Sequence, residues 1–355
     1  MVTPSNKTRN PVITGLGLVC PVGLDVAQAC ASVRAGVSRF QENPNYYCLA
    51  ADADLAEPEP LIWSPVPGIQ ALTGIDRMVE LASLALGNLI QNAHLTREQM
   101  MQTSVFLVFP DEQGKTGQAM EIFAYLETQT GLVYRTGNAF FSTGRMGWFA
   151  ALSQAHSRLS EGVTERVIVV AADSLLDNAT LDQLDQDGRL KSDRNLDGLI
   201  PGEAAAAILL ESRAAASARN VSFYTAIEGW GLAEEPHPFN SPGVSKADGF
   251  TSAVSACLGH LDDEEPITWL ISDFNGESHR GREWGTCLPR LLSKLAITDA
   301  WHPAEYLGES GAASAAIATV LAAHALIKGF APAERALIIG ASNKSTRAAM
   351  LLARP

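Results

Sequence analysis

Hydrophobic residues gather in short runs along this chain. Apolar runs bounded by glycine, proline or charged residues predict buried strands within residues 12–23, 104–110, 164–174, 224–236, 267–276 and 333–343. Segments rich in Ala, Gly and Ser at residues 142–160 and 308–328 predict helices that pack closely in an interior. Because strands alternate with helices and several strands are apolar on both faces, the pattern predicts an α/β fold with mostly parallel sheets covered by helices.

The predicted elements occur twice in the same order. Residues 164–174 (TERVIVVAADS) match residues 333–343 (AERALIIGASN), because in each a Glu-Arg pair leads a buried β run into small residues. Two further pairs match: 12–23 with 224–236, each running into a Gly-x-Gly turn, and 104–110 with 267–276. We therefore expect a duplication with halves of residues 1–215 and 216–355 that form one compact unit. Residues 41–70, rich in proline and acidic residues, are expected to be a surface excursion.

Composition and charge narrow the class of protein. The chain has 355 residues, of which 46% are hydrophobic and 18% charged, so it can bury a large core. The formal net charge of -13 disfavours binding to nucleic acids, anionic membranes and acidic proteins. No uninterrupted run of 18 or more apolar residues occurs, and the first ten residues lack the apolar region of a signal peptide, so we expect neither a membrane span nor a signal peptide. We therefore expect a cytoplasmic protein.

The five cysteines do not form a recognisable site. Their number is odd and their spacing contains no Cys-x-x-Cys pair, which argues against a disulfide framework and against zinc. We expect buried structural thiols at Cys20, Cys30, Cys48, Cys257 and Cys287.

Other binding motifs are also missing from the sequence. The acidic run of Asp182, Asp185 and Asp187 lacks the spacing and terminal glutamate of an EF-hand, so a solvated turn is expected. The glycine-rich stretches match neither a phosphate-binding loop nor a dinucleotide fingerprint. We expect neither a metal ion nor a cofactor.

Three segments carry motifs that occur together in one enzyme family. Residues 12–40 contain a predicted strand, a turn with Pro-Val-Gly, and a helix that ends in a small residue followed by Gly-x-Ser. Residues 74–95 form a predicted helix that begins with an Asp-Arg pair. Residues 192–212 contain the motif Asp-x-x-x-Asp-Gly-x-x-x-Gly-Glu before a predicted strand. Their order and spacing resemble the β-ketoacyl-acyl-carrier-protein synthases of the thiolase-like superfamily. The resemblance covers nearly the whole chain and implies a thiolase-like fold of two duplicated halves in layers α-β-α-β-α.

The resemblance also implies that the catalytic residues have been lost. Condensing enzymes of this family use a cysteine at the N-terminus of a buried helix and two histidines that assist decarboxylation. The motifs place Phe140 at the cysteine, Asn275 at the first histidine and Glu305 at the second. They also place Ala300 at a family lysine and Ile339 at the phenylalanine that gates the acyl pocket. Because phenyl cannot form a thioester and a carboxylate would repel an enolate, we expect no condensing activity.

Alternative registers and nucleophiles are still open at the level of sequence. A small slip would bring His302 to the position of Glu305, and a shifted loop would bring His279 near Asn275, but neither supplies a cysteine. Ser142 precedes the small-residue helix and is a candidate hydroxyl nucleophile, although the sequence shows no base beside it.

Two functions are therefore compatible with the residues. The first is a non-catalytic partner or accessory subunit, similar to a chain-length factor or to a scaffold protein of a biosynthetic or secretion-effector gene cluster. The alternative is a divergent acyltransferase or hydrolase that uses a relocated nucleophile such as Ser142. A cleft filled by Phe140, Phe141 and Phe274 would leave no space for an acyl chain and would exclude the alternative.

The resemblance implies a dimer as well. In the family the strand before the nucleophile loop pairs with its twin across a two-fold axis, and residues 131–137 correspond to it here. An unpaired edge strand would invite uncontrolled association, which pairing removes. We expect a homodimer or a heterodimer with another thiolase-fold protein, and a protein client is a further candidate partner.

Overall fold

Ten strands form the centre of the protein. The computed structural model describes residues 10–48, 58–111, 119–130, 137–259, 261 and 266–354. Within these residues the large sheet has the order β10-β9-β11-β12-β8-β1-β7-β6-β4-β5. Its first five strands in the chain are β1 (Val12–Val19), β4 (Ser104–Val108), β5 (Ala139–Phe141), β6 (Arg166–Ser174) and β7 (Glu203–Glu211). The other five are β8 (Thr225–Glu234), β9 (Ile267–Ile271), β10 (Leu295–Trp301), β11 (Arg335–Ala341) and β12 (Thr346–Ala353).

The arrangement of the first five strands is repeated by the second five. In each set, the strand that comes third in the chain lies at the outer end of the sheet. The second, fourth and fifth strands follow it toward the middle, where the first strand of the set lies. The sense of pairing repeats as well: β4 is parallel to β5 and β6, as β9 is to β10 and β11, whereas β7 and β12 are antiparallel to both neighbours. The sets join where the first residues of β1 pair with those of β8. On this repeat we propose halves of residues 1–215 and 216–355.

The prediction of mostly parallel sheets is wrong, because the sheet is mixed. Only four residues connect β11 to β12, and a connection that short can join only antiparallel neighbours. The apolar runs could not show this, because a strand buried on both faces has the same composition in either orientation.

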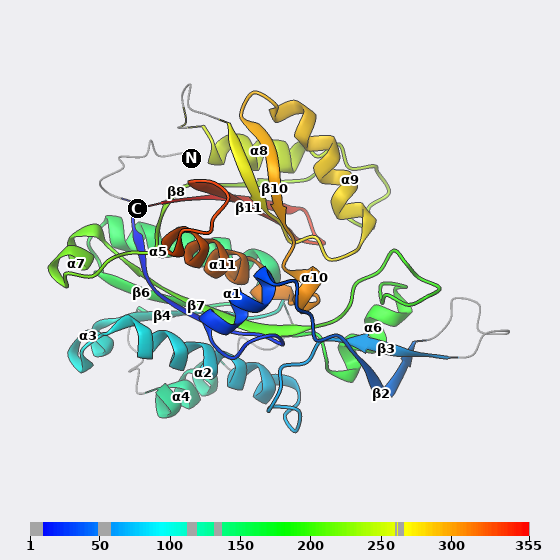
Figure 1. Cartoon of the computed structure of the whole chain (residues 1–355), viewed down its shortest axis with the longest axis horizontal. Helices are drawn as coiled ribbons and strands as arrows, with labels where there is room; N and C mark the ends of the chain where they lie inside the picture. Colours follow the sequence, from blue (N-terminus) through cyan, green and yellow to red (C-terminus); the bar gives the residue numbers. More distant parts are fainter. Residues whose placement is uncertain are drawn as a thin grey trace.

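Helices cover both faces of each set of strands, so the layers follow the order α-β-α-β-α that the resemblance implied (Figure 1). The outer helices of the first set are α2 (Gly74–Ala93), α3 (Arg97–Gln102) and α4 (Ala119–Thr130), and those of the second are α8 (Asp248–Cys257) and α9 (Ser278–Cys287). The central layer contains α1 (Val26–Arg34), α5 (Gly147–Ser160) and α11 (Ser314–Lys328). Shorter elements are α6 (Asn178–Gln186), α7 (Arg213–Ala218), α10 (Ala304–Leu307), η2 (Gly144–Met146), η3 (Leu288–Leu291) and η4 (Gly311–Ala313).

Helix α11 is a core helix. Residues Gly311–Lys328 are long and apolar enough to cross a membrane, but 78% of this stretch is buried inside the protein. The burial follows from composition, because alanine side chains let the helix lie between two sheets.

The glycines of the β1 motif allow a helix to pack closely against the strand. Gly15 and Gly17 lie inside β1 and not in the turn that the sequence predicted. A Cβ atom on Gly17 would lie 2.1 Å from the carbonyl oxygen of Ala85 in α2, so only glycine allows this close packing. The second set contains the same close packing, because a Cβ on Gly231 in β8 would lie 1.9 Å from the carbonyl oxygen of Ala253 in α8.

Two of the family-like motifs meet in a buried ion pair. Arg77 in α2, from the Asp-Arg pair, donates to both carboxylate oxygens of Glu203 in β7, at 2.5 and 2.6 Å. Glu203 is fully buried and also accepts from the Val66 amide at 2.7 Å and the Ser174 hydroxyl at 2.8 Å. These motif residues therefore join a helix to the sheet.

The predicted surface excursion forms a small sheet of its own. Strands β2 (Gln41–Cys48) and β3 (Glu59–Trp63) form a separate antiparallel pair, and β2 is mostly exposed. Residues 131–136 of the expected dimer strand lie outside the described residues. Among the described strands, β5 is the last one of the sheet on that side.

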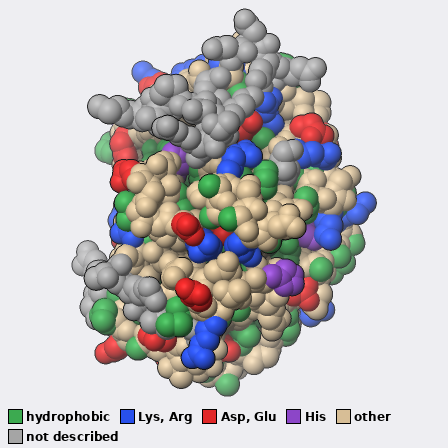
Figure 2. All heavy atoms as spheres, turned by 90° about the vertical axis from the view of Figure 1, so that its left-hand side faces the viewer, with side chains coloured by type: hydrophobic (Ala, Val, Ile, Leu, Met, Phe, Trp, Pro, Cys, Tyr) green, Lys and Arg blue, Asp and Glu red, His purple; other side chains and the backbone are tan. Residues whose placement is uncertain are grey.

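One face of the molecule shows how the surface charges are distributed. In Figure 2, acidic and basic side chains are interspersed, and hydrophobic side chains lie in small separate groups. The described part of this face therefore shows neither a broad basic patch nor a broad apolar one.

Candidate functional site

The phenylalanines of β5 pack on opposite faces of the sheet. Phe140 packs against Phe109 on the outer face, with ring centroids 5.6 Å apart, and Phe141 packs against Phe106 toward the central layer at 5.7 Å. Phe274 belongs to a third cluster beside α8 and α9. Because successive strand residues point to opposite faces, the three rings do not fill one cleft.

Arg145 lies at the beginning of the buried helix α5, in η2. One Nη atom forms an ion pair with Glu309, and the other lies 3.6 Å from Asp273 Oδ2. A positive charge at a helix N-terminus is disfavoured by the helix dipole, so these carboxylates offset an unfavourable position. Burial alone would lower the pKa of Arg145, but the charges of Glu309 and Asp273 raise it.

Asn275 follows β9 and is buried beside the same ion pair. Its Nδ2 donates to Glu309 Oε2 at 2.7 Å and to Glu277 Oε2 at 2.9 Å. Its Oδ1 accepts from the Glu277 amide at 3.2 Å. The side chain therefore connects two carboxylates and is held in one orientation.

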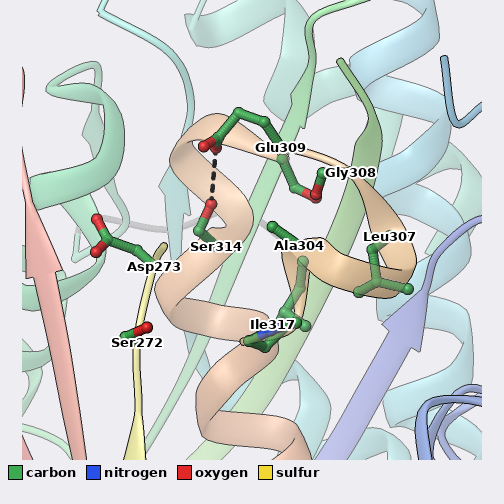
Figure 3. A pocket seen from close by; sticks show the side chains of 10 residues that line it. Ser272, Asp273, Ala304, Leu307, Gly308, Glu309, Ser314 and Ile317 are labelled. Carbon is green, nitrogen blue, oxygen red and sulfur yellow. Dashed lines mark hydrogen bonds between the residues drawn. The ribbon is translucent and has the colours of Figure 1, made fainter. Parts of the chain in front are cut away.

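Glu309 meets Asn275, whereas Glu305 does not. Glu305 is exposed on α10, because that short helix lifts it away from the interior before Gly308, at φ 73°, redirects the chain. The side chain of Glu309 is only 1% exposed, and its Oε1 accepts from the Gly311 amide at 2.7 Å and from Ser314 Oγ at 3.2 Å (Figure 3). Burial alone would raise the pKa of Glu309, but Arg145 and the nearby Arg280 outweigh it, so the pKa lies below its ordinary value.

These residues belong to a larger network, which we call the buried charge cluster. Its members are Arg145, Arg189, Asp273, Asn275, Glu277, Arg280 and Glu309. Arg189 donates to both oxygens of Glu277 at 2.6 and 2.9 Å, and Arg280 donates to Asp273 at 3.0 Å. Three guanidinium groups face three carboxylates, so the formal charges cancel.

Glu277 shows how strongly the cluster holds its carboxylates ionised. Burial alone would raise the pKa of Glu277, but the hydrogen bonds and charge of Arg189, with the charge of Arg280, lower it to about 2. Glu277 and Glu309 are therefore ionised at neutral pH and cannot donate a proton.

Asp173 lies beside the cluster at the end of β6 and was not singled out in the sequence. Its Oδ2 accepts from the Ala312 amide in η4 at 2.7 Å, and its Oδ1 accepts from the Ser174 amide at 2.8 Å. Burial outweighs these bonds and raises the pKa of Asp173 to about 7.

Little space is left beside the cluster. Asp273, Glu309, Ser272 and Ser314 line a void between β9, α10 and α11, shown in Figure 3, with a volume of about 10 Å³. A void of that size holds about one water molecule and cannot hold an acyl chain.

The two histidines considered for the site are held elsewhere. His302 Nδ1 lies 2.6 Å from Ser272 Oγ, and its ring stacks on Phe274. His279 stacks on Phe239 with centroids 4.1 Å apart, and burial lowers its pKa to about 4. Neither ring is bonded to Asn275 or to Glu309.

The candidate nucleophiles lack an activating partner. Ser142 is half-buried and forms no hydrogen bond to another described side chain. All five cysteines are free and buried. Burial raises the pKa of Cys20 and of Cys30 to about 12 and that of Cys48 to about 11, and it also raises the pKa of Cys257 and Cys287. These thiols are poor nucleophiles at neutral pH.

The remaining sequence candidates have separate positions. Ile339 is buried in β11 within the outer cluster of the second set, and Ala300 lines a cavity outside the buried charge cluster. Asp182 accepts a hydrogen bond from the Tyr46 hydroxyl at 3.0 Å. No group of His, Cys, Asp and Glu residues within the described part of the chain could hold a metal ion.

The repeated strand order and the five layers define the fold class (Figure 1). The chain has the thiolase-like fold of ketosynthases, as the motifs implied. A scan against protein-family models and a search of curated proteins found no match to the sequence.

Solved structures match nearly the whole chain. An oxazolomycin ketosynthase domain from Streptomyces albus JA3453 has a TM-score of 0.80 and 14% identity over 98% of this chain and 75% of the domain chain. The ishigamide ketosynthase/chain length factor has a TM-score of 0.76 and 16% identity, covering 98% and 100%. A type II polyketide ketosynthase solved in complex with its acyl-carrier protein has a TM-score of 0.78 and 14% identity, also covering 98% and 100%. At these identities the likeness establishes the fold.

Proposed function

We propose that this protein is a non-catalytic ketosynthase-like protein that acts as a partner or accessory subunit. The observation that carries the proposal is the buried charge cluster, where Arg145, Asn275 and Glu309 meet at the beginnings of the two central helices. Guanidinium is not a nucleophile, asparagine cannot transfer a proton, and the Glu309 carboxylate is ionised and paired. The three side chains neutralise and bind one another, so none is available to a substrate.

The same geometry supports a revised correspondence with the family. We infer that Arg145 and Glu309, and not Phe140 and Glu305, stand at the positions of the cysteine and the second histidine. Arg145 lies at the beginning of the buried helix, where the family cysteine is needed, whereas the ring of Phe140 packs on the outer face of the sheet. In this correspondence Asn275 stays at the first histidine, as the motifs predicted, and it donates a hydrogen bond directly to Glu309.

The rival function gains no support from the site. An acyltransferase or hydrolase that used Ser142 would need a base in contact with its hydroxyl, and no described side chain bonds to it. Ser272 and His302 do form a close pair, but Ser272 is 2% exposed and borders only the small void. A void of about 10 Å³ leaves no room for a substrate carbonyl beside the Ser272 hydroxyl.

The partner that we propose is another thiolase-fold chain, either an intact ketosynthase or a second copy. Among the described strands β5 ends the sheet on one side, and we expect its outer backbone groups to pair with a strand of a partner. One similar structure is named as a ketosynthase/chain length factor, which is a precedent for pairing within this fold. We place the protein in the cytoplasm as part of the same proposal.

A condensation assay tests the loss of catalysis. Purified protein is incubated with malonyl- and acyl-acyl-carrier-protein substrates, with an active ketosynthase as positive control. We expect neither carbon dioxide release nor a ketoacyl product from the wild type or from an Arg145→Cys variant, because Asn275 and Glu309 still cannot assist decarboxylation. Product formation by the wild-type protein would overturn the proposal.

Sedimentation equilibrium at micromolar concentration tests the partner role. The protein is measured alone and mixed with an intact ketosynthase, and a dimer is expected in at least one of the two samples. Phe140→Pro should weaken the dimer by removing an amide of the edge strand. Val244→Pro is the matched control, because Val244 is exposed in a loop and its amide donates to no described backbone carbonyl. A monomer of 37.8 kDa under all conditions would exclude a thiolase-fold partner.

A further inference from the structure

A second cavity lies between α1, α10, α11 and the end of β10, and it is much larger than the void at the buried charge cluster. Its volume is about 200 Å³. Its wall includes the apolar side chains of Val33, Trp301, Leu321 and Phe330. A cavity of about 150 Å³ holds one benzene molecule, so this one has room for a phenyl or branched alkyl group.

Two opposite charges border this cavity. Arg34 projects from α1, and its guanidinium lies over the Phe330 ring, 4.8 Å from the centroid. Glu305 projects from α10 on the other wall. Both side chains are exposed, and neither forms an ion pair with another described residue. The cavity therefore offers one cation and one anion that the described part of the chain leaves unpaired.

His302 supplies a third polar group with a defined orientation. Its Nδ1 edge faces Ser272 Oγ, which also accepts from the Phe274 amide at 3.3 Å. Because the buried Ser272 hydroxyl needs an acceptor for its own proton, it donates to Nδ1, and the neutral ring carries its proton on Nε2. Burial lowers the pKa of His302, which keeps the ring neutral. His302 also lines the cavity, so we infer that this Nε2–H is a donor to a ligand bound there.

We propose that this cavity binds a small zwitterion with an apolar side chain, that is, an apolar α-amino acid. Arg34 and the His302 N–H match the carboxylate, Glu305 matches the ammonium group, and the apolar wall takes the side chain. A simple carboxylate would leave Glu305 unpaired beside it, in a chain whose net charge of -13 already repels anions. A simple amine would leave Arg34 unpaired. This binding does not depend on the proposed partner function.

Isothermal titration calorimetry with L-phenylalanine and L-leucine tests the proposal directly. 3-Phenylpropanoate and 2-phenylethylamine serve as probes that each lack one of the two charges. We expect saturable binding of the amino acids and at least about tenfold weaker binding of both single-charge probes, because each loses one charge-assisted hydrogen bond. Equal binding of 3-phenylpropanoate, or no saturable heat with either amino acid, would overturn the proposal.

Variants of the two exposed charges locate the binding site. Arg34→Gln and Glu305→Gln should each weaken L-phenylalanine binding about tenfold without a change in the unfolding curve. Arg97→Gln is the matched control, because Arg97 is exposed on α3 and far from the cavity wall in sequence and structure. Unchanged affinity in both cavity variants would place any binding elsewhere and refute the assignment.

Discussion

Replacement of Arg145 by methionine isolates the energetic role of the buried charge cluster. The change leaves the Glu309 carboxylate, whose side chain is 1% exposed, without its ion-pair partner. Removing one partner of a buried pair typically costs about 3–5 kcal/mol of unfolding free energy. Glu309 keeps two hydrogen bonds of 2.7 Å, from Asn275 and from the Gly311 amide, so we expect a loss near the lower end, about 3 kcal/mol.

The size of this loss should depend on pH. In the wild type the pKa of Glu309 lies below its ordinary value of 4.5, so the carboxylate contributes stability above that pH and loses it as the pH falls further. Without Arg145, burial raises the pKa of Glu309, and the folded variant is favoured when the carboxyl is protonated. The difference between the wild type and Arg145→Met should therefore be largest at neutral pH and shrink in acid.

Urea unfolding at pH 7 and pH 4.5 measures both effects. In the double variant Arg145→Met/Glu309→Leu most of the lost stability should return, because no unpaired charge is left. Arg290→Met is the control, since its ion pair with Asp248, at 3.0 Å, is exposed and should contribute no more than about 1 kcal/mol. If Arg145→Met costs no more than Arg290→Met at pH 7, the reasoning about the cluster is refuted.

Three further predictions follow from packing, burial and titration. Gly17→Ala in β1 should lower the free energy of unfolding by about 1–3 kcal/mol, because the added Cβ meets the carbonyl of Ala85 in α2. Gly87→Ala, also in α2 but with nothing within 4 Å of the added Cβ, should be neutral or stabilising. Equal effects of the two substitutions would contradict the packing argument. In a labelling experiment at pH 8, iodoacetamide should modify no thiol of the folded protein and all five in urea, since burial raises every thiol pKa; one rapidly labelled cysteine would disprove this. Because folding raises the pKa of Asp173 from 3.8 to about 7, the folded state holds a proton that the unfolded state releases between these pH values. The free energy of unfolding should therefore fall as the pH rises from 3.8 to about 7, and Asp173→Asn should flatten this slope. An unchanged slope in the variant would count against a raised pKa at Asp173.

The fold was predictable in outline because its signals are local. Each predicted strand contains an observed one, such as β1 within residues 12–23 and β11 within residues 333–343. Apolar runs identify strands wherever both faces of the strand are buried. The elements that repeat along the sequence also repeat in the order of strands across the sheet. The direction of β7 and β12 was not predictable from those runs, since burial of a strand does not depend on its orientation.

The candidate site was predictable only in part. Asn275 lies in the buried charge cluster, but Arg145, Arg189, Asp273, Glu277, Arg280 and Glu309 were not identified as its other members. A signal was present: Arg145 and Glu309 are charged residues that begin two small-residue helices expected to be buried, and buried charges need partners. The motif register instead pointed to Phe140 and Glu305.

The sequence by itself therefore determined the elements, their repetition and the lack of a cysteine before the central helix. The tertiary structure decided which charged side chains meet there. Arg145 and Glu309 are 164 positions apart, and their contact depends on the turn at α10 and Gly308, which moves Glu305 to the surface and Glu309 into the interior. Ion pairing is a property of distance and burial in space, which hydrophobic periodicity along a chain does not encode.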